Sequence, residues 1–357
     1  MSSVKSCGGG GMVKSSKVKT QNSIVSNYSQ LISIESLFQA WREFKRGKRN
    51  KMDVQVFERN LEDNLFDLER KLETKTYKHG NYQDFYINDP KRRHIHKALV
   101  GDRIVHHLLY KYLYGLFDNT FIFDSYSCRL GKGTHKTVDR LEKFARIVSK
   151  NYKEKCWSLK LDIKKFFDSI DHQILLNLIS DKVEDENIIW LIREVIQSFS
   201  TPNRGLTPKG MPLGNLTSQI FANIYLNELD QFVKHELKIK YYIRYADDFV
   251  ILDGSIEKLI HYVNIMESFL EKKLKLKLHT KKIIIRKLAQ GIDFCGYVVL
   301  PHYCLVRTKT RNRIFKRVLR EGISNQSLQS YLGHFSHAQT YYLSRDLNNQ
   351  AWLNQIR

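Results

Sequence analysis

Apolar residues recur at three- and four-residue spacing in two segments near the start of the chain, IESLFQAWREFKRG (34–47) and VQVFERNLEDNLFDLERKLE (54–73). This period predicts an amphipathic helix in each segment. Between residues 89 and 107, charged and aliphatic residues alternate, which favours strands or a hairpin leading into a third helix, RIVHHLLYKYLYGLF (103–117). Residues 1–34 begin with a stretch rich in Gly, Ser and Lys, and we interpret them as a disordered basic tail.

Strand and helix patterns alternate between residues 157 and 300. Alternate apolar positions in WSLKLD (157–162) predict a strand that ends in an acid, and Asp171 is placed to cap the helix that follows. In YYIRYADDFVIL (241–252), two β-prone apolar runs flank a pair of acids and predict a hairpin. We therefore expect an α+β layer, one sheet with helices on one face, followed by two or three short helices in the basic segment from residue 307.

Composition adds a strong positive charge to this picture. The chain has 59 Lys+Arg against 37 Asp+Glu, a formal net charge of +22, with Tyr and Phe interleaved among the cations. These features are typical of proteins that neutralise a phosphate backbone and stack on bases. A ribosomal or membrane-surface protein would share the charge, so it favours nucleic-acid contact without indicating any chemistry. A hydrophobic fraction of 42% excludes a disordered chain.

Other sequence features restrict the compartment and the metal chemistry. No apolar run approaches the roughly 18 residues of a membrane span, and no secretory signal is recognised, so we expect a cytoplasmic protein with no membrane partner. The five cysteines are odd in number and include no C-x-x-C pair, which argues against a disulfide framework and against a structural zinc site. The thirteen histidines show no helix-spaced ligand set, so we expect any metal on carboxylates.

Three acids stand where chemistry is expected. Asp247 and Asp248 are adjacent acids inside an apolar hairpin, where they repel each other. Two charged residues inside such an apolar element usually mark a functional or a strained site. They suit a hard divalent cation, because Mg²⁺ binds few carboxylates plus substrate phosphates. Two such ions, about 4 Å apart, promote an in-line phosphoryl displacement. Taken alone, Asp162 is an ordinary strand-terminating acid, and a Y-x-D-D string is suggestive only.

Six motifs, taken in order, resemble those of reverse transcriptases, the RNA-directed DNA polymerases with a palm fold. YADD resembles the catalytic box of that family, LDIKKFFDSID the first carboxylate motif, SYSCRLGKGTH the finger motif before it, RGLTPKGMPLGNLTSQIFANIYL the glycine-and-helix motif, LHTKKI the lysine-bearing motif and FCGY the primer grip. The resemblance covers about residues 85–300. It implies an α+β right-hand polymerase with fingers, a palm built from an antiparallel sheet backed by helices, and a short helical thumb. The N-terminal helices and fingers would span 35–150, the palm 151–300 with part of the fingers between its motifs, and the basic helical thumb 301–357.

Within the family, LGNLTSQ (213–219) resembles the pattern of diversity-generating retroelement enzymes, whereas group II intron enzymes usually read QGxxxSP there. The resemblance implies a bacterial enzyme that makes cDNA from an RNA template, with dNTPs and a DNA or RNA primer. Further partners would be a structured non-coding RNA and a small accessory protein. Three alternatives stay open: an antiphage defence reverse transcriptase with the same chemistry, a non-catalytic RNA-binding palm protein, and an RNA-dependent RNA polymerase, which Phe167 disfavours.

The resemblance also implies roles for single residues. Asp162, Asp247 and Asp248 would be catalytic and, with the backbone carbonyl of Ile163, would bind two Mg²⁺ ions, with Mn²⁺ as an alternative. The implied nucleotide-binding residues are Phe167, Gly214, Gln219, Arg129, Arg93 and Lys282. Phe167 would be the steric gate against a ribose 2′-hydroxyl, or else a core aromatic; Lys282, or its rival Lys281, would assist pyrophosphate departure. The primer grip would consist of Phe294, Gly296 and Tyr297.

Overall fold

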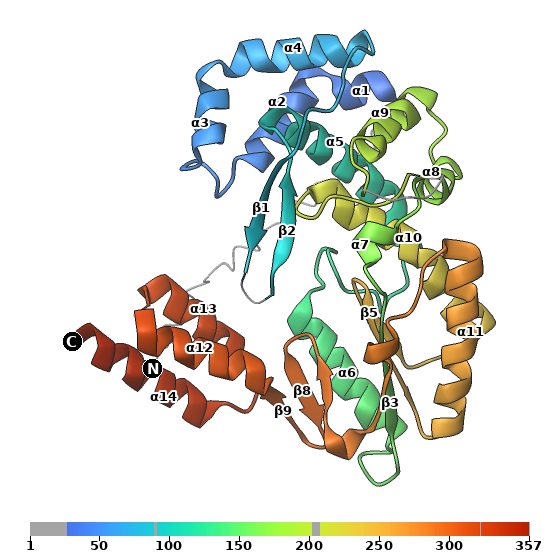
Figure 1. Cartoon of the computed structure of the whole chain (residues 1–357), viewed down its shortest axis with the longest axis vertical. Coiled ribbons are helices and arrows are strands. Elements are labelled where there is room, and N and C mark those ends of the chain that lie inside the picture. The colour runs from blue at the N-terminus through green and yellow to red at the C-terminus, as the bar shows by residue number, and fades with distance from the viewer. Residues whose placement is uncertain (1–26, 89–90, 202–207, 322, 357) are drawn as a thin grey trace, which may run out of the picture.

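The computed structural model describes residues 27–88, 91–201, 208–321 and 323–356. A block of helices lies at one end, a two-stranded hairpin projects from it, and a sheet flanked by helices forms the other end (Figure 1). The last three helices lie together to one side of that sheet (Figure 1). No described helix is both long enough and apolar enough to span a bilayer.

The N-terminal block contains α1 (Tyr28–Ile32), α2 (Ile34–Phe44), α3 (Met52–Arg59), α4 (Leu61–Glu73) and α5 (Val100–Phe117). Helix α1 lies inside the segment predicted as a tail and buries Tyr28 and Leu31, so that prediction was wrong from Asn27 onward. The rest of the predicted tail, residues 1–26, lies outside the described residues. The single helix predicted over 54–73 is two helices, because Asn60 leaves the helical region, with φ −120° and ψ 46°.

The predicted hairpin is present and begins earlier in the chain than expected. Strands β1 (Gln83–Ile87) and β2 (Arg93–Lys97) pair antiparallel. The N–H of His96 donates to the carbonyl of Leu213 at 2.9 Å, and Asn215 Nδ2 donates to the carbonyl of His96 at 2.8 Å. These bonds attach the hairpin to the loop before α10 (Leu216–Gln231).

A four-stranded antiparallel sheet carries the predicted acids. Its strand order is β4 (Tyr242–Tyr245), β5 (Asp248–Asp253), β3 (Trp157–Asp162) and β6 (Ile284–Lys287). Phe249 and Ile251 pack into one core with α10 and α11 (Ile256–Leu274), whereas Val250 and Leu252 pack into a second core with α6 (Thr134–Val148). The expectation of helices on one face was therefore wrong. A continuous apolar run such as FVIL is typical of a strand buried on both faces.

A second sheet and three helices complete the chain. The expectation of a single sheet was wrong, because β7 (Ile292–Phe294), β8 (Tyr297–Leu300) and β9 (Tyr303–Val306) form a separate antiparallel sheet. The helices predicted after residue 307 are confirmed as α12 (Thr308–Glu321), α13 (Asn325–Phe335) and α14 (Tyr341–Ile356). Ile314, Phe335 and Leu347 from these helices join the same core as the second sheet.

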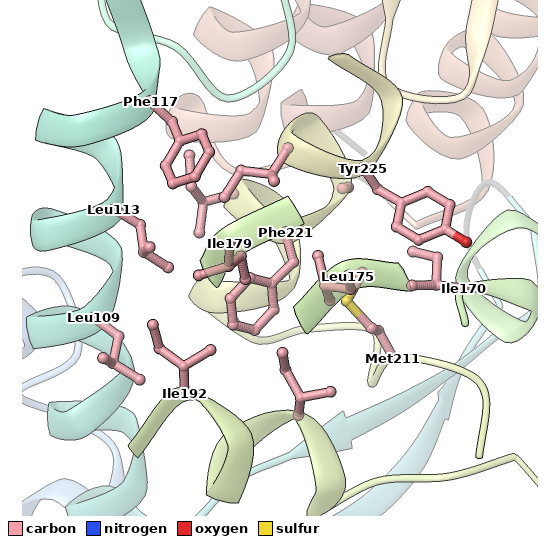
Figure 2. Close-up of a cluster of buried hydrophobic side chains, with 14 of the residues drawn as sticks. Leu109, Leu113, Phe117, Ile170, Leu175, Ile179, Ile192, Met211, Phe221 and Tyr225 are labelled. Carbon is pink, nitrogen blue, oxygen red and sulfur yellow. The ribbon is translucent and has the colours of Figure 1, made fainter. Parts of the chain in front are cut away.

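The first core holds α10 in place. The helices between β3 and α10 are α7 (Phe166–Ser169), α8 (His172–Ser180) and α9 (Glu186–Gln197). As predicted, Asp171 caps α8, because its carboxylate accepts from two backbone N–H groups of that helix. Figure 2 shows Leu113 of α5, Ile179 of α8 and Phe221 of α10 in one buried cluster. Each such side chain stabilises the fold by about 1.5–3 kcal/mol on burial. Short 3₁₀ turns lie at Asp118–Thr120, Thr280–Lys282 and Leu288–Gln290, and a π-helical turn, Phe232–Glu236, continues α10.

Candidate active site

The three predicted catalytic acids meet at one end of the central sheet. Asp162 ends β3 and pairs in register with Asp248, which begins β5. Tyr245 also pairs with Asp248 across the hairpin, so Ala246 and Asp247 form its two-residue loop. Asp162 is buried, with 7% of its surface exposed. We call Asp162, Asp247 and Asp248 the acid centre.

The loop that presents these acids is conformationally strained. Ala246 has a φ of 54°, in the left-handed region that residues other than glycine rarely adopt. Two-residue hairpin loops favour such values because they match the twist of the strands. For an alanine the cost is about 1–2 kcal/mol. The surrounding structure must therefore hold the loop in place, as strained residues at functional sites require.

Arg244, which the sequence analysis did not single out, holds the loop from beneath. Its guanidinium is fully buried and donates to Asp230 of α10 three times, from Nη2 to Oδ2 at 2.6 Å and from Nε to Oδ1 at 2.8 Å and to Oδ2 at 3.0 Å. Nη1 donates to the carbonyl of Ala246 at 3.1 Å and to Asn223 Oδ1 at 3.3 Å. Asp230 also accepts from the hydroxyl of Tyr242 at 2.7 Å. The available signal in the sequence was an arginine inside a strand of otherwise apolar and aromatic residues.

Burial and mutual repulsion raise the pKa values of two carboxyl groups in the acid centre. Burial, and then the charge of Asp162, raise the pKa of Asp247 above its usual value. Burial, reinforced by both neighbouring acids, raises the pKa of Asp248 to about 6, although Lys160 opposes this with its Nζ 4.0 Å from Asp248 Oδ2. Lys282 donates from Nζ to Asp162 Oδ2. The centre therefore concentrates negative charge that a cation would stabilise.

The donor chemistry of the acid centre fits a hard divalent cation. Among the described residues, no three His, Cys, Asp or Glu side chains converge on one point as a metal-ligand set of their own. Mg²⁺ does not require such a set, because it commonly takes one or two carboxylates and completes its shell with water and substrate phosphates. Asp162 and Asp248 face each other across paired strands, and Asp247 directly precedes Asp248, so the acid centre meets that requirement. Ile163, whose carbonyl was predicted as a further ligand, lies beside Asp162 in a single bridge with Leu278.

Two predicted nucleotide-binding residues lie at the start of α10. Gly214 precedes the helix with a φ of 109°, and a Cβ at this position would lie 2.7 Å from Ile95 Cγ2 of the hairpin. Both the backbone angle and the close approach therefore require glycine there. Gln219 lies exposed on the first turn of α10, with its side chain open to a ligand.

Arg93 and Lys282 interact with the acids, whereas Arg129 does not serve the site as predicted. Phe167 is half-buried in α7, and Arg93 begins β2 and acts electrostatically on Asp247. Arg129 Nε donates to Asp118 Oδ1 at 2.7 Å, and the rest of its guanidinium donates to three backbone carbonyls of residues 118–125. Because four of its donor contacts hold this loop, we correct the expectation that Arg129 meets the nucleotide.

The predicted primer grip also needs correction. Phe294 and Tyr297 are fully buried, and the Tyr297 hydroxyl donates to the carbonyl of His334 in α13 at 2.8 Å. These two rings therefore join the second sheet to the C-terminal helices and have no surface to offer a primer. Gly296, at the hairpin tip between them, has a φ of 91° and remains partly exposed. Contact with a primer at this hairpin would come from backbone at Gly296.

Similarity to known proteins extends over the region that contains the acid centre. Residues 88–299, more than half of the chain, match the family model described as reverse transcriptase (RNA-dependent DNA polymerase). An uncharacterized 91 kDa protein in the cob intron of Schizosaccharomyces pombe is 34% identical over 136 residues, which cover 38% of this chain and 16% of that protein. The group II intron-encoded protein LtrA of Lactococcus lactis is 24% identical, covering 66% of this chain and 49% of LtrA.

The chain spans about half or less of the length of the first curated relatives that it matches. Among solved structures, a telomerase from Candida albicans aligns with a TM-score of 0.48 and 14% identity, covering 73% of this chain and 51% of that one.

Proposed function

This chain belongs to the reverse transcriptase (RNA-dependent DNA polymerase) family, and on that premise we propose that it is an RNA-directed DNA polymerase. It copies an RNA template into cDNA from dNTPs, starting at the 3′-hydroxyl of a DNA or RNA primer. The observation that carries this proposal is the acid centre: three carboxylates meet at the end of a sheet, with two of them facing each other across paired strands.

In this proposal Asp162, Asp247 and Asp248 hold two Mg²⁺ ions, for which Mn²⁺ can substitute, and the carbonyl of Ile163 assists. When bound, such ions neutralise phosphate charge and favour attack by the primer hydroxyl on the α-phosphate, with pyrophosphate leaving. The protein supplies position: the buried network of Arg244 fixes the loop, so that the acids need no rearrangement as the reaction proceeds. We assign the departing pyrophosphate to Lys282, and its contact with Asp162 supports this role.

The remaining site residues select the nucleotide. Phe167 excludes a ribose 2′-hydroxyl, a role its half-buried position five residues beyond Asp162 supports. Gly214 lets backbone approach the nucleotide, and Gln219 reaches toward the base pair or sugar. Arg93 binds the triphosphate. The hairpin and N-terminal helices act as fingers, the central sheet as the palm, and α12 to α14 as a thumb whose basic helix α12 grips the duplex.

For the biological role we propose a diversity-generating retroelement, in which the enzyme works with a structured non-coding RNA and a small accessory protein. The support is the LGNLTSQ motif at 213–219. The group II intron-encoded relative LtrA favours a second candidate, an intron-type retroelement. The error spectrum distinguishes them: misincorporation concentrated opposite template adenines supports diversification, and evenly distributed errors at a low rate support the intron type.

The test of the activity is primer extension on a defined RNA template with Mg²⁺, with dNTPs or rNTPs. We expect extension with dNTPs, and Phe167→Ala should admit ribonucleotides at least 10-fold more readily. Phe166→Leu is the matched control, because the neighbouring Phe166 is a core aromatic. Absence of extension by the wild-type chain would contradict the proposed activity, and unchanged sugar selectivity in Phe167→Ala would make Phe167 a packing residue.

A further inference from the structure

Lys160 places a positive charge at an inward position of β3, between the two sheets. Alternate residues of a strand point to opposite faces, so Lys160 shares one face of β3 with Asp162. Lys160 pairs in register with Val250 of β5, which belongs to the core that the second sheet also joins. Only 18% of the Lys160 side chain is exposed. Because lysine is mostly exposed in folded proteins, the contacts of this one indicate what it does.

The amine of Lys160 contacts both the acid centre and the second sheet. Its Nζ lies 4.0 Å from Asp248 Oδ2. The same Nζ donates to the carbonyl of Asp293 in β7 at 3.0 Å. It also lies over the ring of Phe294, 5.7 Å from the ring centroid, which is within the range of a cation–π interaction. One cation therefore joins a carboxylate of the acid centre to the first strand of the second sheet.

The hairpin formed by β7 and β8 brings its tip toward the same two charges. Phe294 pairs with Tyr297, so Cys295 and Gly296 form its two-residue loop. Burial, and then the charge of Asp248, raise the pKa of the Cys295 thiol to about 12, whereas Lys160 opposes this. Such interactions weaken with distance. The tip of the hairpin therefore lies in the neighbourhood of Lys160 and the acid centre.

Arg307 holds the same hairpin from the side of the C-terminal helices. Its guanidinium pairs with the carboxylate of Asp293, and its N–H donates to the carbonyl of Gly296 at 3.0 Å. Arg307 directly precedes α12, so these contacts fasten the hairpin to the start of that helix. Lys160 supplies the corresponding contact toward the acid centre.

We propose that Lys160 is a positioning residue that sets the β7–β8 hairpin relative to the acid centre, and so aligns the end of a primer at Gly296 with the carboxylates. It acts through the carboxylate of Asp248 and the backbone of Asp293. The alignment of a primer rests on the proposed polymerase function, whereas the link between Lys160 and Asp248 rests on the contacts alone. Alignment matters because a misplacement of about 1 Å at the reacting atoms can cost roughly 100-fold in rate.

The first test is single-turnover extension of a preformed primer–template complex with saturating dNTP and Mg²⁺. It compares the wild type with Lys160→Met, which removes the charge, and with Lys160→Arg, which keeps it. Lys287→Met is the matched control, because Lys287 of β6 also lies over an aromatic ring, that of Trp157, at 5.2 Å. Trp157 is at the opposite end of β3 from Asp162. If Lys160→Met does not fold, Lys160→Gln takes its place.

We expect Lys160→Met to lower the rate constant by roughly 10- to 100-fold while primer–template affinity changes by less than about 2-fold. Lys160→Arg and the control should stay within about 3-fold of the wild-type rate constant, since neither removes a charge beside Asp248. A role confined to folding would lower the amplitude of the reaction, which counts correctly folded enzyme, and leave its rate constant unchanged. That result, or equal slowing by Lys160→Met and Lys160→Arg, would overturn the proposal.

The second test requires no activity. Thermal melts at pH 7.5 in EDTA compare Lys160→Met, Asp248→Asn and the variant with both changes. Lys160→Met should lower Tm more in the wild-type background than in the Asp248→Asn background, because the cation then has no carboxylate to stabilise. Lys287→Met should have the same effect in both backgrounds.

Equal effects of Lys160→Met in the two backgrounds would overturn the link on which the proposal stands. If the melts show the coupling but the wild type extends no primer, the link between Lys160 and Asp248 stands. The polymerase proposal then fails, together with the primer alignment that rests on it.

Discussion

The acid centre and a basic groove, which is lined by Arg92, Arg93, Lys164 and Lys165 among other residues, are built in opposite ways. The acid centre places like charges within a strained loop, and a fully buried ion pair between Arg244 and Asp230 holds that loop from below. The groove places like charges around an open cavity, mostly on side chains that reach solvent. The comparison teaches that one region keeps its geometry through internal pairing, whereas the other keeps its charge available for a ligand. Mutations should therefore damage the first through structure and the second through binding.

The largest effect should come from breaking the ion pair beneath the acid loop. Arg244→Met leaves Asp230 buried and unpaired, so we expect a loss of about 3–5 kcal/mol in the free energy of unfolding, measured in denaturant. Arg140→Met is the control, because its ion pair with Asp124 is partly exposed and should cost much less. A loss below about 1 kcal/mol for Arg244→Met would contradict the account.

A paired substitution separates positioning from folding. Arg244→Met combined with Asp230→Leu removes both buried charges, and such replacements are often close to neutral in stability. The carbonyl of Ala246 still loses its donor. We therefore expect the double variant to recover most of the stability of the wild type but not its kcat for primer extension. Recovery of both would reduce Arg244 to a purely structural residue.

A smaller effect, of opposite sign, should follow from neutralising a crowded acid. The raised pKa of Asp248, about 6, means that the folded state favours its protonated form, so its carboxylate destabilises the metal-free protein as pH rises from about 4 to 6. Asp248→Asn should therefore stabilise the protein at pH 7.5 in EDTA by about 1 kcal/mol, after allowance for the partial exposure of this side chain. The gain should shrink toward pH 5 in thermal melts. A variant less stable than the wild type at pH 7.5 would contradict this expectation.

The smallest effect should arise at a strained lysine of the groove. Lys165→Gly removes the backbone strain of a left-handed residue but adds chain entropy to the unfolded state. We therefore expect a net gain of about 0.5 kcal/mol in the free energy of unfolding, with several-fold weaker pyrophosphate binding. Lys238→Gly is the matched control: Lys238 also has a positive φ, 54°, and does not line the groove. It should show a similar gain with unchanged pyrophosphate affinity. The same weakening in both variants would contradict a specific role for the groove.

Local pattern predicted much of the acid centre but little of what surrounds it. The strand ending at Asp162 and the hairpin at Asp247 and Asp248 follow from alternation and turn chemistry, which are local properties. The apolar period does not report which strands pair with one another, so it predicted one sheet covered on one face. Residues 157–306 instead form two sheets, and the four-stranded sheet is buried on both faces.

Single residues were harder to predict where their role depends on distant partners. In a chain with many cations, the neighbouring sequence does not distinguish Arg129 from Lys165. Arg129 donates to backbone carbonyls of a loop, whereas Lys165 lines the groove. Arg244 lies in strand β4 and its partner Asp230 in helix α10, and the partner of Tyr297 lies in the C-terminal helix α13. Such contacts arise only in the folded chain.

The most direct test of the account is the rate of single-nucleotide addition to a primed RNA template with Mg²⁺, comparing the wild type with Asp247→Ala plus Asp248→Ala. The control is Lys258→Gln plus Lys272→Gln, which replaces two exposed lysines of α11. Thermal melts verify that all three proteins are folded. We predict a rate loss on the order of 10³-fold or more for the acid variant and wild-type rates for the control. Equal addition by the acid variant and the wild type would contradict the assignment of the reaction to the acid centre.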